Sequence, residues 1–186
     1  MKKAVFIDKD GTLIKDFPYN VDPQRIQLYE DAGKSLKSLK DNGFMLVMIS
    51  NQSGVARGYF AEEELKRVEE KIQQELASEG VQLDALYFCP HHPEGVVDQY
   101  SIECDCRKPK PGMIIDASKK LGIRLKESWM IGDILHDIEA GNKAGCKTIL
   151  INNGNETEWR ITSSRLPTGI ANSIADAVQL ILNRNE

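Results

Sequence analysis

The residues best suited to chemistry are two aspartates near the start of the chain, Asp8 and Asp10, in the string FIDKDGTL. They follow a short apolar run, residues 4–7, of the kind that forms a strand buried on both faces of a parallel sheet. Gly11 and Thr12 then free the backbone to turn. A polar turn without chemistry is the alternative for this string alone. However, ligands bind at the carboxyl ends of strands in open α/β sheets, and paired carboxylates there suit a magnesium ion.

Three further apolar segments are also followed by polar side chains. These side chains are Ser50 and Asn51, Arg107 and Lys108, and Asp133 and Asp137. Phosphoryl transfer needs a nucleophile, fixed positive charge and in-line positioning more than elaborate bond chemistry. A carboxylate can attack phosphorus and divide a very slow hydrolysis into two easier steps through an acyl phosphate. The set of side chains therefore indicates phosphoryl transfer.

Cysteine and histidine residues form a separate cluster in the sequence. Cys89, Cys104 and Cys106 lie close together, with His91 and His92 between them. In a reducing compartment this clustering favours metal binding over disulfides, and free surface thiols at Cys104 and Cys106 are the alternative. The fourth cysteine, Cys146, lies in an apolar stretch and is expected to be a small core residue without chemistry.

Strands and helices that alternate along the chain must position these residues. Apolar runs predict strands at residues 4–7, 44–49, 83–88, 129–131 and 146–151. Periodic apolar residues predict helices at 32–42, 62–79, 111–121, 135–144 and 171–182, the first capped by Asp31 and the third beginning with Pro111. Residues 15–29 predict an ordered loop over the ligand-binding edge. The alternation predicts an α/β fold with a doubly wound, mainly parallel sheet covered on both faces.

Composition limits the classes of function that fit the chain. It has 186 residues, of which 41% are hydrophobic and 28% charged, and a formal net charge of −4. This length predicts one domain, residues 1–186, with a substantial core. Charges of both signs are mixed, so neither a nucleic-acid nor a membrane partner is expected. No stretch approaches the ~20 apolar residues that span a bilayer, and we expect a cytoplasmic monomer.

The four polar strand ends, in this order, resemble the four motifs of the haloacid dehalogenase superfamily over residues 4–151. The resemblance implies a Rossmann-like fold and a phosphomonoesterase in which Asp8 is the nucleophile that becomes phospho-aspartate. It implies that Asp10 is the general acid and base, and that Ser50 contacts the phosphoryl group with Asn51 beside it. Two further implied roles concern charge. Lys108, assisted by Arg107, supplies the cation, whereas magnesium is held by the carboxylates of Asp8 and Asp133 and by the backbone carbonyl of Asp10, with Asp137 completing the acidic pattern.

Three strings narrow the resemblance: SNQSGVARGYF, CPHHPEG and CDCRKPKPGM. Together they are similar to the bacterial D-glycero-D-manno-heptose-1,7-bisphosphate 7-phosphatases and, secondarily, to the histidinol-phosphate phosphatases. Both branches lack a large cap domain and carry a zinc-bound loop, and the first branch acts on a small phosphorylated sugar. The implied zinc ligands are Cys89, His91, Cys104 and Cys106, a set that suits a closed tetrahedral structural site. His92 is not expected to bind zinc, because the family motif uses the first histidine.

Some features depart from the resemblance or leave alternatives open. Ile134 stands where many relatives place a basic residue after Asp133, which predicts altered phosphate affinity with activity retained. Residues 152–169 suggest no chemistry and are expected only to connect to the last helix. Histidinol-phosphate phosphatase is the rival enzyme, although the long segment 90–103 and the ARG string at 56–58 favour the sugar branch. A signalling receiver domain is the rival of another class, but a receiver keeps its acceptor aspartate later in the chain and needs no zinc loop.

Overall fold

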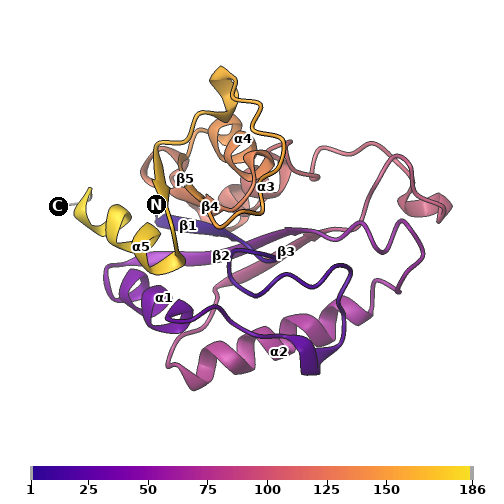
Figure 1. The fold of residues 1–186 in the computed structure, drawn as a ribbon, viewed down its shortest axis with the longest axis horizontal. Helices are drawn as coiled ribbons and strands as arrows, with labels where there is room; N and C mark the ends of the chain where they lie inside the picture. The colour runs from indigo at the N-terminus through magenta and orange to yellow at the C-terminus, as the bar shows by residue number, and fades with distance from the viewer. Residues whose placement is uncertain (1, 185–186) are drawn as a thin grey trace.

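The computed structural model describes residues 2–184, which build a six-stranded sheet (Figure 1). The strands are β1 (Lys3–Asp8), β2 (Phe44–Asn51), β3 (Ala85–Cys89), β4 (Trp129–Gly132), β5 (Lys147–Ile151) and β6 (Gly169–Ala171). They lie in the order β3-β2-β1-β4-β5-β6, and every neighbouring pair is parallel. This arrangement confirms the predicted parallel sheet. Because all the strands point the same way, their carboxyl ends meet at one edge.

Helices cover both faces of the sheet, as predicted (Figure 1). In the view, α1 (Ala32–Asp41) and α2 (Glu64–Ser78) lie below the sheet, and α3 (Gly112–Leu121) and α4 (Leu135–Ala144) lie above it. The last helix, α5 (Ile174–Asn183), is at the left and shares a core with α1 and α2. Short 3₁₀ turns lie at Pro23–Arg25, Asp98–Tyr100, Leu125–Glu127 and Ser163–Arg165. Within residues 2–184, no large cap domain interrupts these elements, and no helix has both the length and the apolar character needed to cross a membrane.

Strand β1 lies inside the sheet and is buried on both faces. Successive side chains of a strand point to opposite faces. Val5 and Ile7 therefore join the core formed with α1, α2 and α5, whereas Ala4 and Phe6 join the core formed with α3. The apolar run before Asp8 thus serves both cores. It fixes the position of Asp8 at the carboxyl edge from the two sides.

Three details of the predicted elements are wrong. Asp31 precedes α1 but adopts a left-handed conformation, with φ of 60°, and makes no capping hydrogen bond. Pro111 precedes the third helix, which begins at Gly112. The last helix begins at Ile174, where Ser173 Oγ caps it by accepting a hydrogen bond from the backbone N–H of Asp176 at 3.1 Å. The edge strand β6 ends at Ala171, two residues before this cap, and is too short to give a periodic signal.

Residues 15–29 form an ordered loop beside the carboxyl edge, as predicted. The loop closes on itself near its ends, where Ile14 bridges to Leu28 and the backbone N–H of Lys15 donates to the carbonyl of Gln27 at 2.9 Å. It brings Asp16 to the wall of the cavity that contains Asp8. The loop therefore covers part of the edge where the polar residues gather.

Candidate active site

Three buried carboxylates converge at the carboxyl edge of the sheet. Asp8 ends β1, Asp133 follows the neighbouring strand β4, and Asp137 lies in the first turn of α4. One oxygen from each lies within 4.8 Å of the others. They are 7%, 4% and 0% exposed, and they line a cavity of about 240 Å³. The fold thus brings together residues that are separated by more than a hundred positions in the sequence.

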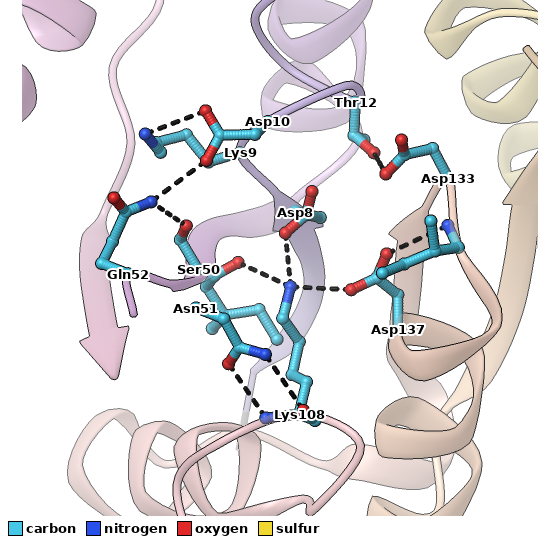
Figure 2. Close-up of polar contacts among 12 residues, drawn as sticks. Asp8, Lys9, Asp10, Thr12, Ser50, Asn51, Gln52, Lys108, Asp133 and Asp137 are labelled. Carbon is cyan, nitrogen blue, oxygen red and sulfur yellow. Dashed lines mark hydrogen bonds and ion pairs between the residues drawn. The ribbon is translucent and has the colours of Figure 1, made fainter. Parts of the chain in front are cut away.

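Lys108 reaches into the middle of this group (Figure 2). Its Nζ contacts a carboxylate oxygen of Asp8 and lies 2.7 Å from Asp137 Oδ1. Burial alone would lower the pKa of Lys108, but the carboxylates of Asp137 and Asp8 raise it above its ordinary value. The two carboxylates therefore favour the charged form of Lys108, which lines the cavity with them.

One lysine does not neutralise three carboxylates. Burial raises the pKa of Asp8 well above its ordinary value, Lys108 opposes that shift, and the neighbouring aspartates add to it. Burial, together with Asp137, raises the pKa of Asp133 to about 6. The excess negative charge and the hard oxygen donors fit a divalent cation such as magnesium. All three carboxylates lie close enough together to contribute to such a site, and Lys108 pairs with two of them, Asp8 and Asp137.

Asp10 is held beside this group by two side chains. Lys9 Nζ lies 3.0 Å from Asp10 Oδ1, and Gln52 Nε2 donates to Asp10 Oδ2 at 3.0 Å. The same Gln52 amide donates to the hydroxyl of Ser50 at 2.7 Å (Figure 2). Gln52 and Lys9 are both buried. Gln52 therefore fixes Asp10, from the end of β1, against Ser50, at the end of β2.

Of the two residues expected beside Ser50 and Lys108, Asn51 lines the same cavity as they do, whereas Arg107 does not. The amide of Asn51 is engaged with the backbone of Lys108, donating to its carbonyl and accepting from its N–H, both at 3.0 Å. Asn51 thus holds Lys108 in place. Arg107 lines a neighbouring cavity of about 480 Å³ with His92 and Lys110, and Lys108 borders both cavities.

The cysteine and histidine residues gather where β3 ends. The sulfurs of Cys89, Cys104 and Cys106 lie 3.1–3.5 Å from one another, and His91 Nδ1 is 3.4 Å from the Cys106 sulfur. A zinc tetrahedron with Zn–S bonds of about 2.3 Å has edges of about 3.8 Å, so the four groups need to open only slightly to hold zinc.

The remaining histidine and cysteine of interest lie apart from this group. His92 is outside it, and its Nε2 is 3.2 Å from a guanidinium nitrogen of Arg57. Cys146 is buried in the core beside α3. Neither residue is therefore part of the cluster formed by Cys89, His91, Cys104 and Cys106.

Several residues at the site were not singled out in the sequence. Thr12 Oγ1 donates to Asp133 Oδ1 at 3.0 Å, and Asn155 Nδ2 donates to Asp133 Oδ2 at 2.7 Å. Asn153 Nδ2 donates to the carbonyl of Gly11 at 2.7 Å. The expectation that residues 152–169 only connect β5 to the last helix is therefore wrong. Gln52 could have been noticed within the polar string after β2, but no local signal marks Asn155.

Comparison with known proteins defines the class of this one. A family model described as HAD-hydrolase-like matches residues 105–177. The crystal structure of D,D-heptose 1,7-bisphosphate phosphatase from B. bronchiseptica, complexed with magnesium and phosphate, superposes with a TM-score of 0.80 at 27% identity and covers 98% of this chain and 99% of that one. The fold, the converging carboxylates and these matches define a HAD-like phosphatase.

Closer relatives narrow the class to one family. A D-glycero-beta-D-manno-heptose-1,7-bisphosphate 7-phosphatase of Pasteurella multocida is 43% identical over 97% of both chains. One of Haemophilus ducreyi is 47% identical over 82% of this chain and 85% of that one. The chain belongs to the family of D-glycero-beta-D-manno-heptose-1,7-bisphosphate 7-phosphatases. The relatives favour this prediction over the histidinol-phosphate and receiver alternatives.

Proposed function

We propose that this protein is a magnesium-dependent phosphatase that removes the 7-phosphate of D-glycero-D-manno-heptose 1,7-bisphosphate, with residues 1–186 acting as one domain. The observation that carries the substrate is the 43% identity, over 97% of both chains, with a relative named for this activity. That relative is named for the β anomer, so we propose the β anomer as the preferred substrate. The charge and geometry of the cavity support the mechanism.

The proposed mechanism has two steps. A carboxylate oxygen of Asp8 attacks phosphorus, so that an Asp8–phosphorus bond forms while the bond from phosphorus to the sugar oxygen breaks. Asp10 gives its proton to the departing sugar oxygen. Asp10 then takes a proton from a water molecule that attacks the same phosphorus, releasing inorganic phosphate and restoring the carboxylate of Asp8. The burial of Asp8 and the two anchors on Asp10 support these roles.

Fixed groups in the cavity would stabilise the charge of the transferring phosphoryl group. Lys108 supplies a buried positive charge, the Ser50 hydroxyl donates a hydrogen bond, and Asn51 keeps Lys108 in place. We propose that Asp8, Asp133 and the backbone carbonyl of Asp10 bind magnesium. When bound, magnesium neutralises charge on the phosphoryl oxygens. Arg107, in the adjacent cavity, would contact the rest of the substrate.

The substrate proposal is tested by phosphate release with three substrates: the β and α anomers of the heptose bisphosphate, and histidinol phosphate. We expect kcat/KM for the β anomer to exceed the other two values by about a hundredfold, equivalent to about 2.7 kcal/mol of transition-state binding. A preference for the α anomer would overturn only the proposal that the β anomer is the preferred substrate. Preference for histidinol phosphate would overturn the heptose proposal and leave the mechanism standing, whereas equal, weak rates would overturn every substrate named here.

We also propose that Cys89, His91, Cys104 and Cys106 bind a structural zinc ion. Zinc would fix the segment that leads directly into Lys108, because Cys106 is two residues before it. The proximity of these four groups supports the proposal. Zinc binding is worth on the order of 10–16 kcal/mol in zinc-finger peptides.

Zinc removal is expected to destabilise the protein and to lower its activity. In the Cys104→Ser variant, we expect the zinc content to fall from about one ion per chain to near zero, and the free energy of unfolding to fall by about 3 kcal/mol or more. Elemental analysis and urea denaturation measure the two effects. Cys146→Ser is the control and should keep its zinc, because Cys146 lies apart from the cluster. A wild-type protein that folds fully without zinc would contradict the proposal.

A further inference from the structure

The stretch that follows β5, residues 153–156, lies against the cluster of three buried carboxylates at the edge of the sheet. We propose that Asn155 is a positioning residue, which orients the carboxylate of Asp133 for magnesium. The proposal rests on the proposed assignment of Asp133 as a magnesium ligand. It gives a role to a part of the chain that has no sequence motif.

The contacts of Asp133 define that role. Its two carboxylate oxygens accept hydrogen bonds from donors on different segments, Thr12 Oγ1 at 3.0 Å and Asn155 Nδ2 at 2.7 Å. Two donors on opposite oxygens fix the rotation of the carboxylate plane. Each carboxylate oxygen can accept more than one contact, so both retain capacity for a metal ion.

The charges around the site also support a role for Asp133 in metal binding. The other two carboxylates of the group, Asp8 and Asp137, both form ion pairs with Lys108. Among the described residues, Asp133 has no such ion pair, and its side-chain partners are a hydroxyl and an amide. Neutral donors orient a carboxylate without cancelling its charge. Asp133 therefore keeps the negative charge that a cation needs.

The stretch that carries Asn155 is anchored at several points. Its backbone N–H donates to Asn153 Oδ1 at 3.2 Å, and the Asn153 amide donates to the carbonyl of Gly11 at 2.7 Å. One residue further on, Glu156 Oε2 accepts from the backbone N–H of Leu135, the first residue of α4, at 2.6 Å. The stretch is thus tied to the loop after β1 and to α4. Asn155 is held between these ties.

Gly11 provides the space for the contact. Its φ is +82°, a conformation that favours glycine. A Cβ atom at this position would collide with the carboxylate of Asp133 and lie 2.5 Å from Asn155 Nδ2. The three residues therefore form one close-packed unit, in which the missing side chain of Gly11 lets Asn155 reach Asp133.

The test is metal binding by Asn155→Ala. Mn²⁺, which also favours oxygen ligands, is titrated into the protein and the free ion is measured by electron paramagnetic resonance. We expect the Mn²⁺ Kd to rise about 10- to 100-fold, the usual effect of removing a partner of a metal ligand. The melting temperature and, at saturating magnesium, the KM for substrate should stay unchanged, because Asn155 is exposed and is assigned no substrate contact.

Two control variants make the outcome decisive. Asn152→Ala removes an exposed asparagine immediately before this stretch and should change the Mn²⁺ Kd less than twofold. Asp133→Asn should abolish binding at this site. If Asp133→Asn loses Mn²⁺ while Asn155→Ala binds normally, the positioning role is overturned and the magnesium assignment stands. If Asp133→Asn binds normally, both are overturned. A raised KM with unchanged Mn²⁺ affinity in Asn155→Ala would assign Asn155 to substrate binding and overturn the positioning role.

Discussion

Replacing Asp8 with asparagine is expected to abolish phosphatase turnover while leaving the fold intact. The side-chain amide of asparagine has almost the same shape as the carboxylate but is a poor nucleophile, so the covalent step is lost. We expect phosphate release to fall by about 10⁴-fold or more, as expected when an enzyme loses its nucleophile. Acid-quenched reactions with a radiolabelled substrate should yield labelled wild-type protein and no labelled variant.

A measurement of thermal stability distinguishes loss of the nucleophile in Asp8→Asn from loss of the fold. The pKa of Asp8 is raised in the folded protein by burial and by neighbouring aspartates, although Lys108 opposes the shift. Because this pKa is raised, the ionised carboxylate destabilises the folded state relative to the unfolded state at any pH above the ordinary pKa of an aspartate. The neutral asparagine should therefore melt at the same temperature as the wild type or higher near pH 7. Covalent labelling of Asp8→Asn, or turnover within tenfold of the wild type, would contradict the assignment of the nucleophile.

Replacing Lys108 with methionine is expected to damage both activity and stability. Methionine is similar in length but carries no charge, so Asp8 and Asp137 lose the cation that they share. Removing one partner of a buried ion pair typically costs about 3–5 kcal/mol. We expect a loss of that size in urea denaturation, and a fall in kcat of about 10³-fold, because the charge facing the phosphoryl group is also lost.

A nearby lysine provides the matched control for this variant. Lys110 is 44% exposed and lies 3.8 Å from Asp105, so Lys110→Met should change stability by less than about 1 kcal/mol. Adding Asp137→Asn to Lys108→Met should cost less than the sum of the single changes, because the two residues interact directly. Equal effects of Lys108→Met and Lys110→Met, or strict additivity in the double variant, would show that the buried cation is not coupled to these carboxylates.

Local sequence signals predicted most of the elements that form the sheet and its covering helices. The apolar run before Asp8 and the stripe of Leu65, Val68, Ile72 and Leu76 are such signals, and the structure buries all of these residues. In contrast, β6 has three residues, and its pairing with β5 is a tertiary contact. The order of the strands could not be predicted either, since no local pattern encodes which strands become neighbours.

The sequence predicted the site residues that lie at or directly after the end of a strand. It did not predict the residues whose positions depend on distant parts of the chain. Asp8 ends one apolar strand and Asp133 directly follows its neighbour, and the carboxyl ends of these strands share an edge. Asn155 reaches Asp133 only through the path of the chain beyond β5. The separation of Arg107 from the carboxylate cavity likewise depends on how the chain turns after Cys106. These placements arise from packing, which spacing in the sequence does not record.

The pair of hydrogen bonds between Asn51 and the backbone of Lys108 has a consequence for how this protein can vary in length. They fix the lysine from the end of β2, while Cys89, Cys104 and Cys106 draw together the two ends of the intervening segment. The turn at Asp98–Tyr100 lies between these fixed points and is itself held, because the Tyr100 hydroxyl donates to Glu62 and the Tyr100 carbonyl accepts from the backbone N–H of His92. Insertions and deletions in this segment would therefore disturb the contacts of Tyr100 before they reach Lys108, which Asn51 holds from a different strand.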